Sequence, residues 1–247
     1  MNPVEEILIA LVIFCGSSVQ TIAGFGFGLV AVPLFLVLGL SLPTAVLLAA
    51  SSSLFNTLRA AWVFRAHVPI KEVLECSVIR LSMAPVGLTF LFLMERFDPA
   101  LSKVWAGWIF LVLLAVKIFS GKRNLRVKHG GWLALTAAVS GFLATSIGVG
   151  GPPMVFWSAA RGWKPEKQRS FTLGVFATTQ LPIVALLIWR FPREAVLLPM
   201  RILYILPVLF LGVAVGHSLS KKIPSETLEI VMNVILLLGS LKLAFGV

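Results

Sequence analysis

Two glycine-rich stretches, at similar positions in the two halves of the chain, could bind a small anion through their backbone. The first reads Thr-Ile-Ala-Gly-Phe-Gly-Phe-Gly over residues 21–28, and the second reads Gly-Val-Gly-Gly-Pro-Pro over residues 148–153. Glycine permits positive φ and close approach of another group, and proline suits the first turn of a helix. Each stretch therefore predicts a break from which a new helix starts, and the free N–H groups of a helix start attract small anions. The predicted substrate-binding residues accordingly include Gly24, Gly26, Gly28, Gly148, Gly150 and Gly151.

Neutral polar side chains flank both stretches. Thr145 and Ser146 precede the second stretch, and Asn56 and Gln180 lie in the apolar segments that follow the first and the second. Such groups hydrogen-bond an anion without trapping it, so all four are candidate binding residues. The alternative for the serine and threonine is a bond to their own backbone or to a neighbouring helix.

Arg80 lies near the middle of a predicted apolar segment. Ionisable residues at that depth are costly and usually functional, so Arg80 is a further candidate substrate-binding residue that attracts the anion. The alternatives are a structural ion pair and snorkelling of the side chain toward the membrane surface, although the spacing from Glu75 is poor for an ion pair on one helix.

Carboxylates and metal ligands are sparse. Asp98 is the single aspartate and falls in a predicted loop, and no glutamate lies deep in a predicted span. This disfavours a proton relay, a cation-selective carboxylate ring and a hydrolytic carboxylate pair. Cys15 and Cys76 have no second thiol or histidine at ligand spacing, so neither a metal site nor a cofactor is predicted. Ser146 with His217 leaves an intramembrane hydrolase as an alternative class.

Membrane helices are the elements that must position these residues. Of the 247 residues, 58% are hydrophobic and 13% are charged, whereas soluble domains carry about 25% charged residues. Residues 7–58, 130–160 and 170–189 contain no aspartate, glutamate, lysine, arginine or histidine, and about 20 apolar residues span a bilayer. We therefore predict an all-α polytopic membrane protein. The net charge of +11 is interpreted as basic loops that record topology, not as nucleic-acid binding.

Apolar runs bounded by proline, glycine and charge predict the helical segments. These are 5–22, 28–41, 43–65, 72–94, 100–119, 130–147, 152–163, 166–190, 194–220 and 225–246. Segments 28–41 and 152–163 are short. At 1.5 Å per residue they reach about 18–21 Å, less than the roughly 30 Å hydrocarbon core, which favours a turn inside the membrane over a full crossing.

The basic residues predict the orientation. Residues 122–129 are rich in lysine and arginine, so this linker is expected in the cytoplasm. Counting crossings then places the N-terminus outside and the loops Arg65–Lys71 and Arg161–Arg169 inside. The two glycine-broken hairpins consequently enter from opposite faces of the membrane.

An internal repeat relates the two halves. Aligning Thr21 with Thr145 places Asn56 on Gln180, and one further residue of shift places Gly87 on Gly212. With their opposite orientations, residues 1–121 and 130–247 form a predicted inverted-topology repeat around the linker 122–129. Each half is a Gly-broken helical hairpin followed by three transmembrane helices, as in many secondary transporters. The alternative is convergence on glycine-rich helix packing.

The stretch over residues 21–33, Thr-Ile-Ala-Gly-Phe-Gly-Phe-Gly-Leu-Val-Ala-Val-Pro, together with residues 148–153, resembles the TauE/SafE family of sulfite-exporter-like permeases. The resemblance covers essentially the whole chain. It implies transport of sulfite or an organosulfonate across a bacterial inner membrane, and it implies that both glycine motifs belong to the substrate region. Pro152 and Pro153 depart from the more flexible pair that is frequent in the family.

We therefore expect a secondary transporter of a small sulfur-containing anion, exporting by alternating access, and no enzymatic activity. A passive anion channel, an importer of a related anion and a non-transporting membrane subunit are the alternatives. The expected partners are the anion and the lipid bilayer, and small-residue helix faces permit a homodimer.

Overall fold

The structure, a computed structural model, describes residues 3–63, 68–120, 131–196, 198–219 and 225–246. These residues form α-helices with no strand among them, so the predicted all-α class is confirmed for this part of the chain. The helices are α1 (Pro3–Ala23), α2 (Phe27–Val37), α3 (Leu42–Val63), α4 (Ile70–Phe97), α5 (Pro99–Ser120), α6 (Gly131–Ser146), α7 (Gly151–Ala160), α8 (Pro165–Arg190), α9 (Pro192–Ala195), α10 (Leu198–Leu219) and α11 (Ser225–Phe245).

Length and composition make four of these helices candidate membrane spans. They are α1, α4, α8 and the part of α5 over Pro99–Ile118. Helices α2 and α7 are short, as predicted, although they end at Val37 and Ala160, a few residues before the expected ends. The predicted segment 194–220 is wrong as one helix, because α9 ends at Ala195 and α10 begins only at Leu198. The predicted linker 122–129 lies outside the described residues.

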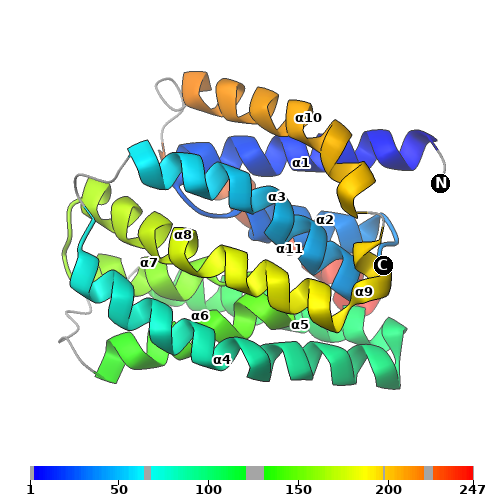
Figure 1. Ribbon diagram of the computed structural model, residues 1–247, viewed down its shortest axis with the longest axis horizontal. Helices are drawn as coiled ribbons and strands as arrows, with labels where there is room; N and C mark the ends of the chain where they lie inside the picture. Colours follow the sequence, from blue (N-terminus) through cyan, green and yellow to red (C-terminus); the bar gives the residue numbers. More distant parts are fainter. Residues whose placement is uncertain (1–2, 64–67, 121–130, 197, 220–224, 247) are drawn as a thin grey trace.

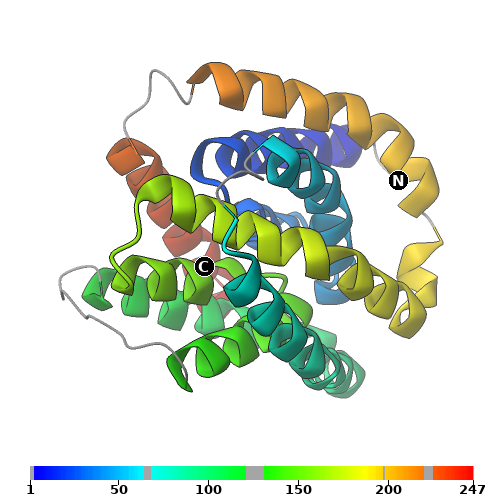
Figure 2. The same cartoon turned by 60° about the vertical axis from the view of Figure 1, so that its left-hand side comes forward.

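The helices pack as two bundles. Each bundle is built mostly from one half of the chain and also contains one helix from the other half. Helix α10, from the second half, packs along α1, and α4, from the first half, packs along α6. Helices α1, α2, α3 and α10 form what we call the upper bundle, and α4, α6, α7 and α8 form the lower bundle (Figure 1). Contacts of α3 with α8 join the two bundles directly. Helices α5 and α11 pack on each other and join them indirectly, because α11 also packs on α2 and α5 also packs on α4. The turned view shows the same layers (Figure 2).

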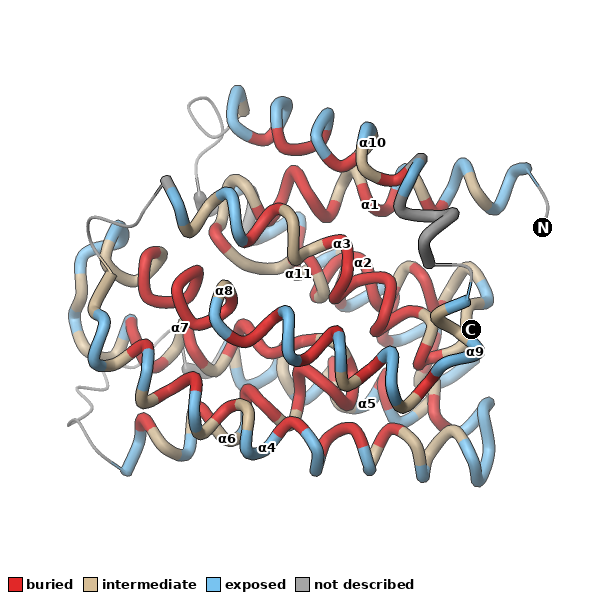
Figure 3. The backbone as a smooth tube through the Cα atoms, in the orientation of Figure 1, coloured by how far each residue is buried: buried red, intermediate tan, exposed pale blue. Residues whose placement is uncertain are grey.

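Burial distinguishes inner from outer helices. Helix α2 is apolar all round and mostly buried, with Val30, Val32 and Phe35 fully excluded from solvent, as expected of a helix surrounded by others. The outer helices alternate buried and exposed residues (Figure 3). Their exposed positions include large apolar side chains such as Val78 and Leu203. An apolar exterior over a packed interior fits a protein whose surroundings are lipid.

The direction of each helix decides which helix termini, and which basic residues, lie at each end of the molecule. In Figure 1, α4 and α8 start at the left end of the molecule, whereas α3 and α10 end there. The starts of α4 and α8 carry Lys71 and Lys167, and their other ends carry Arg96 and Arg190. The molecule therefore has two opposite ends, each assembled from helix termini of both halves.

Candidate functional site

Two interrupted helices meet in the middle of the molecule. Helix α1 ends at Ala23 and α2 begins at Phe27, with Gly24 and Gly26 at φ 82° and 101°. Helix α6 ends at Ser146 and α7 begins at Gly151, with Gly148 at φ 74°. A side chain is strained at such φ values, which is why glycine occupies these breaks.

The two breaks touch each other. A methyl group on Gly28 would overlap the backbone carbonyl of Gly148, and one on Gly151 would lie 3.3 Å from the Phe25 ring. Gly28 and Gly151 have ordinary φ values, so at Gly28 the glycine is needed for close approach and not for backbone freedom.

A cavity of about 50 Å³ lies between the breaks. A cavity needs roughly 10–15 Å³ to hold one water, so this cavity has room for a few waters or one small oxyanion. The predicted site residues that line it are Gly26, Gly28, Arg80, Gly148, Gly150, Gly151 and Gln180. The first residues of α2 and α7 belong to the wall, so two helix N-termini face the cavity, an arrangement that suits an anion.

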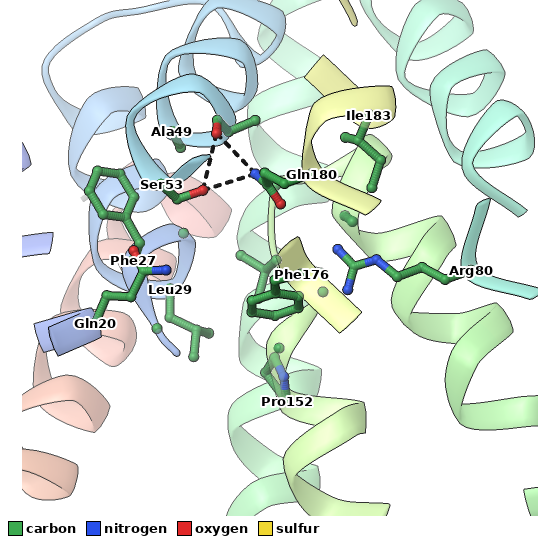
Figure 4. Close-up of a pocket in the computed structure, with 18 residues that line it drawn as sticks. Gln20, Phe27, Leu29, Ala49, Ser53, Arg80, Pro152, Phe176, Gln180 and Ile183 are labelled. Carbon is green, nitrogen blue, oxygen red and sulfur yellow. Dashed lines mark hydrogen bonds between the residues drawn. The ribbon is translucent and has the colours of Figure 1, made fainter. Parts of the chain in front are cut away.

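Arg80 projects from α4 toward the cavity (Figure 4). The side chain is only 2% exposed. Its Nη1 donates to Ser140 Oγ at 3.0 Å, and its Nε has no hydrogen-bond partner in the described part of the chain. The guanidinium carbon stands 4.7 Å from the centre of the Phe176 ring, a cation–π contact. A buried cation with donors left over is ready to bind an anion.

Ser140 connects Arg80 to the second break. Its hydroxyl donates to the Gly150 carbonyl at 2.6 Å while it accepts from Arg80. A Cβ atom on Gly150 would stand 3.0 Å from Arg80 Nη2. Ser140 and Phe176 were not among the predicted site residues, because nothing in their local sequence separates them from ordinary packing residues.

Gln180 lines the cavity, but its amide is already engaged. Its Nε2 donates to the Ala50 carbonyl and to Ser53 Oγ, both at 2.9 Å. These bonds join α8 to α3 across the bundle interface (Figure 4). The described contacts thus give Gln180 a role in holding two cavity walls together.

Asn56 belongs to a buried polar cluster beside the cavity and does not line it. Its Nδ2 donates to the Ser17 carbonyl at 3.3 Å and to Gln20 Oε1 at 3.2 Å. Gln20 lines the cavity and donates to Thr57 Oγ1 at 2.9 Å. Asn56 therefore reaches the cavity only through Gln20.

Thr145 and Ser146 also lie outside the cavity wall. Thr145 Oγ1 donates to the Ala84 carbonyl at 2.8 Å, which ties α6 to α4. Ser146 is fully buried, and its hydroxyl has no partner among the described residues. The hydroxyl is accordingly not paired with His217, as a hydrolase dyad would require. Binding roles for Thr145 and Ser146 remain predictions.

Gly24 faces an arginine of the other bundle. Arg169 Nη2 donates to the Thr21 carbonyl at 2.7 Å and to the Ile22 carbonyl. A Cβ atom on Gly24 would stand 2.6 Å from Arg169 Cγ. Because Arg169 stands on α8 and these carbonyls end α1, the contact bridges the bundles, and a cation suits a helix C-terminus. The sequence predicted only that Arg169 belongs to a basic loop.

Metal chemistry has no support in the described residues, where no group of three or more histidine, cysteine, aspartate or glutamate side chains could hold an ion. A comparison with protein families matches residues 8–243 to the family described as sulfite exporter TauE/SafE. Searches of curated proteins and of solved structures found no match.

Proposed function

We propose that this chain, which belongs to the sulfite exporter TauE/SafE family, exports a small sulfur-containing anion such as sulfite or an organosulfonate by alternating access. The family consists of membrane transporters of sulfite-like anions, not enzymes. The export direction, the substrate and the mechanism are our proposals.

The observation that carries the proposal is Arg80 at the cavity. A buried charge is costly unless it is paired, and the described residues give this guanidinium one hydroxyl and one aromatic face. A bound anion would supply the missing partner. Hydrogen bonds to charged groups contribute about 1.5–3 kcal/mol each, which is enough to make the anion a specific ligand.

An inverted repeat is supported by equivalent contacts in the two halves. Gly87 of α4 packs against the backbone of α6, and Gly212 of α10 packs against the backbone of α1 at Phe14. The predicted alignment pairs Gly87 with Gly212, and α4–α6 and α10–α1 are the corresponding helix pairs. We propose that residues 1–121 and 130–247 are the two repeat units.

The position of the cavity supports the proposal of alternating access. The cavity lies between two bundles that each contain one helix break. Rocking of one bundle against the other would expose the anion first to one face of the membrane and then to the other. With the inside negative, exit of each negative charge is favoured by about 2.3 kcal/mol per 100 mV, so export needs no coupled ion.

Ligand-induced thermal stabilisation of the purified protein tests the proposal. Sulfite, sulfate, thiosulfate, sulfoacetate, isethionate, taurine and chloride are compared as ligands. A ligand at 100 times its Kd stabilises by about 2.7 kcal/mol, so one sulfur anion should raise Tm saturably.

The Arg80→Gln variant should lose this shift, because it removes the cation at the cavity. Arg59→Gln is the matched control, since Arg59 is an exposed arginine of α3 outside the cavity wall. Counterflow in liposomes then separates a carrier from a channel. A sulfite shift of equal size in wild type and Arg80→Gln would contradict the assigned site, and no shift with any sulfur anion would contradict the function.

A further inference from the structure

The cavity holds one formal charge. Arg80 is the only ionisable side chain among the described residues that line it. The helices that pack around Arg80 supply no counter-charge: α6 and α7 contain no ionisable residue, and α8 contains none over residues 170–189. On α4 itself, Cys76 is buried, and Glu75 lines a separate groove with Leu74 and Leu133.

The helix N-termini at the cavity supply oriented N–H groups but little net charge. The N-terminus of α2 lies beside the C-terminus of α1, and the N-terminus of α7 lies beside the C-terminus of α6. The positive and negative dipole ends of each break therefore largely cancel. Arg169 lies at the α1 end, where its guanidinium binds the carbonyls of Thr21 and Ile22. Among the described residues that line the cavity, Arg80 carries the one charge without a counter-charge.

We propose that this site selects its substrate by charge and takes a small sulfur oxyanion as the monoanion, hydrogen sulfite in the case of sulfite. The inference rests on the proposed function and deepens it. A monoanion makes a neutral pair with Arg80, whose guanidinium stays protonated. A dianion would leave one negative charge buried without a cationic partner, which is unfavourable.

The pH dependence of transport tests this inference on the unmodified protein. Labelled sulfite is taken up by liposomes that contain the protein, across a pH range spanning the second dissociation of sulfurous acid. Above that point the hydrogen sulfite fraction falls about tenfold per pH unit. The KM expressed as total sulfite should rise by the same factor, while the KM expressed as hydrogen sulfite should stay constant.

Chlorate is the control for titration of the protein itself. It is a pyramidal XO₃ ion like sulfite but stays a monoanion at every pH used. Chlorate should compete with sulfite, with an inhibition constant that does not change with pH. Sulfate and thiosulfate, which stay dianions, should compete at least tenfold more weakly.

A second positive charge in the cavity wall should change the preferred substrate from the monoanion to the dianion. Gln180→Lys adds an ammonium to the α8 side of the cavity wall, and Gln20→Lys adds one to the α1 side if the first variant does not fold. Either variant should accept the dianion, so its KM for total sulfite should no longer rise with pH. Arg59→Gln should behave like wild type.

The outcomes separate this inference from the function on which it rests. Saturable transport with a KM for total sulfite that is independent of pH, or with sulfate competing better than chlorate, overturns charge selection and leaves the transporter standing. The absence of saturable transport at every pH, for sulfite and for each of the other sulfur anions compared above, overturns the proposed function. Liposomes without protein correct for passive leak.

Discussion

Arg80 depends on its neighbours for a defined orientation. One hydrogen bond to Ser140 and one contact with the Phe176 face hold a side chain that is 2% exposed. A long side chain loses considerable rotamer entropy when it is fixed, and two contacts at different angles reduce the remaining freedom. Ser140 and Phe176 are thus positioning residues for the anion site.

Ser140→Ala should weaken anion binding. The variant removes the acceptor for Arg80 Nη1 and the donor to the Gly150 carbonyl, and unsatisfied buried groups cost about 1–3 kcal/mol each. We expect a lower Tm and a smaller sulfite-induced shift. The measurement is thermal unfolding with and without sulfite.

Ser158→Ala is the matched control, because Ser158 is equally buried but donates only to Val155 in its own helix. If both variants kept the full sulfite-induced shift, Ser140 would have no positioning role.

The helix breaks are stabilised by contacts with the opposite bundle. Arg169, near the start of α8, binds the last carbonyls of α1, and Gly28, near the start of α2, contacts the Gly148 carbonyl. Carbonyls at a helix end have no partner within the helix, so a guanidinium from outside is an effective cap.

Arg169→Ala should loosen the first break. Losing charge-assisted bonds to the Thr21 and Ile22 carbonyls should cost about 1–3 kcal/mol and accelerate amide hydrogen exchange over residues 21–28. Arg169→Lys should be intermediate, because an ammonium is a point charge and not a planar fork.

Lys167→Ala controls for removing a charge from the same helix turn, since Lys167 stacks over Trp163 and not over α1. Equal exchange over residues 21–28 in the Arg169→Ala and Lys167→Ala variants would exclude the capping role.

The whole molecule is organised by the exchange of α4 and α10 between the halves. Each bundle contains helices of both halves, so neither half encloses the cavity alone. The basic residues at the helix ends then relate this assembly to the membrane, since cytoplasmic loops carry an excess of lysine and arginine.

Cysteine labelling tests the proposed orientation in a variant without Cys15 and Cys76. A membrane-impermeant maleimide added to intact cells should label Arg96→Cys and Arg193→Cys, and it should leave Lys71→Cys and Lys164→Cys unlabelled until the cells are opened. All four positions are exposed. Labelling of the lysine positions in intact cells would reverse the orientation and place the N-terminus inside.

Composition and local sequence pattern determined the fold class of this protein and identified the buried charge at its site, Arg80. Long runs without ionisable residues predicted an all-helical membrane protein, because a bilayer admits few other structures. Glycines and prolines located the helix breaks, since backbone geometry is a local property. Arg80 was identifiable because a charge inside an apolar run is costly wherever the chain places it.

The contacts that make the site were decided by tertiary structure alone. Three contacts join residues far apart in the sequence: the close approach of Gly28 to Gly148, the bond from Gln180 to Ala50 and the bond from Arg169 to Thr21. No local pattern distinguishes these partners, because their meeting depends on how whole helices pack. For the same reason Asn56 and Thr145, chosen as polar neighbours of the breaks, turned toward other helices, whereas Ser140 and Phe176 came to hold Arg80.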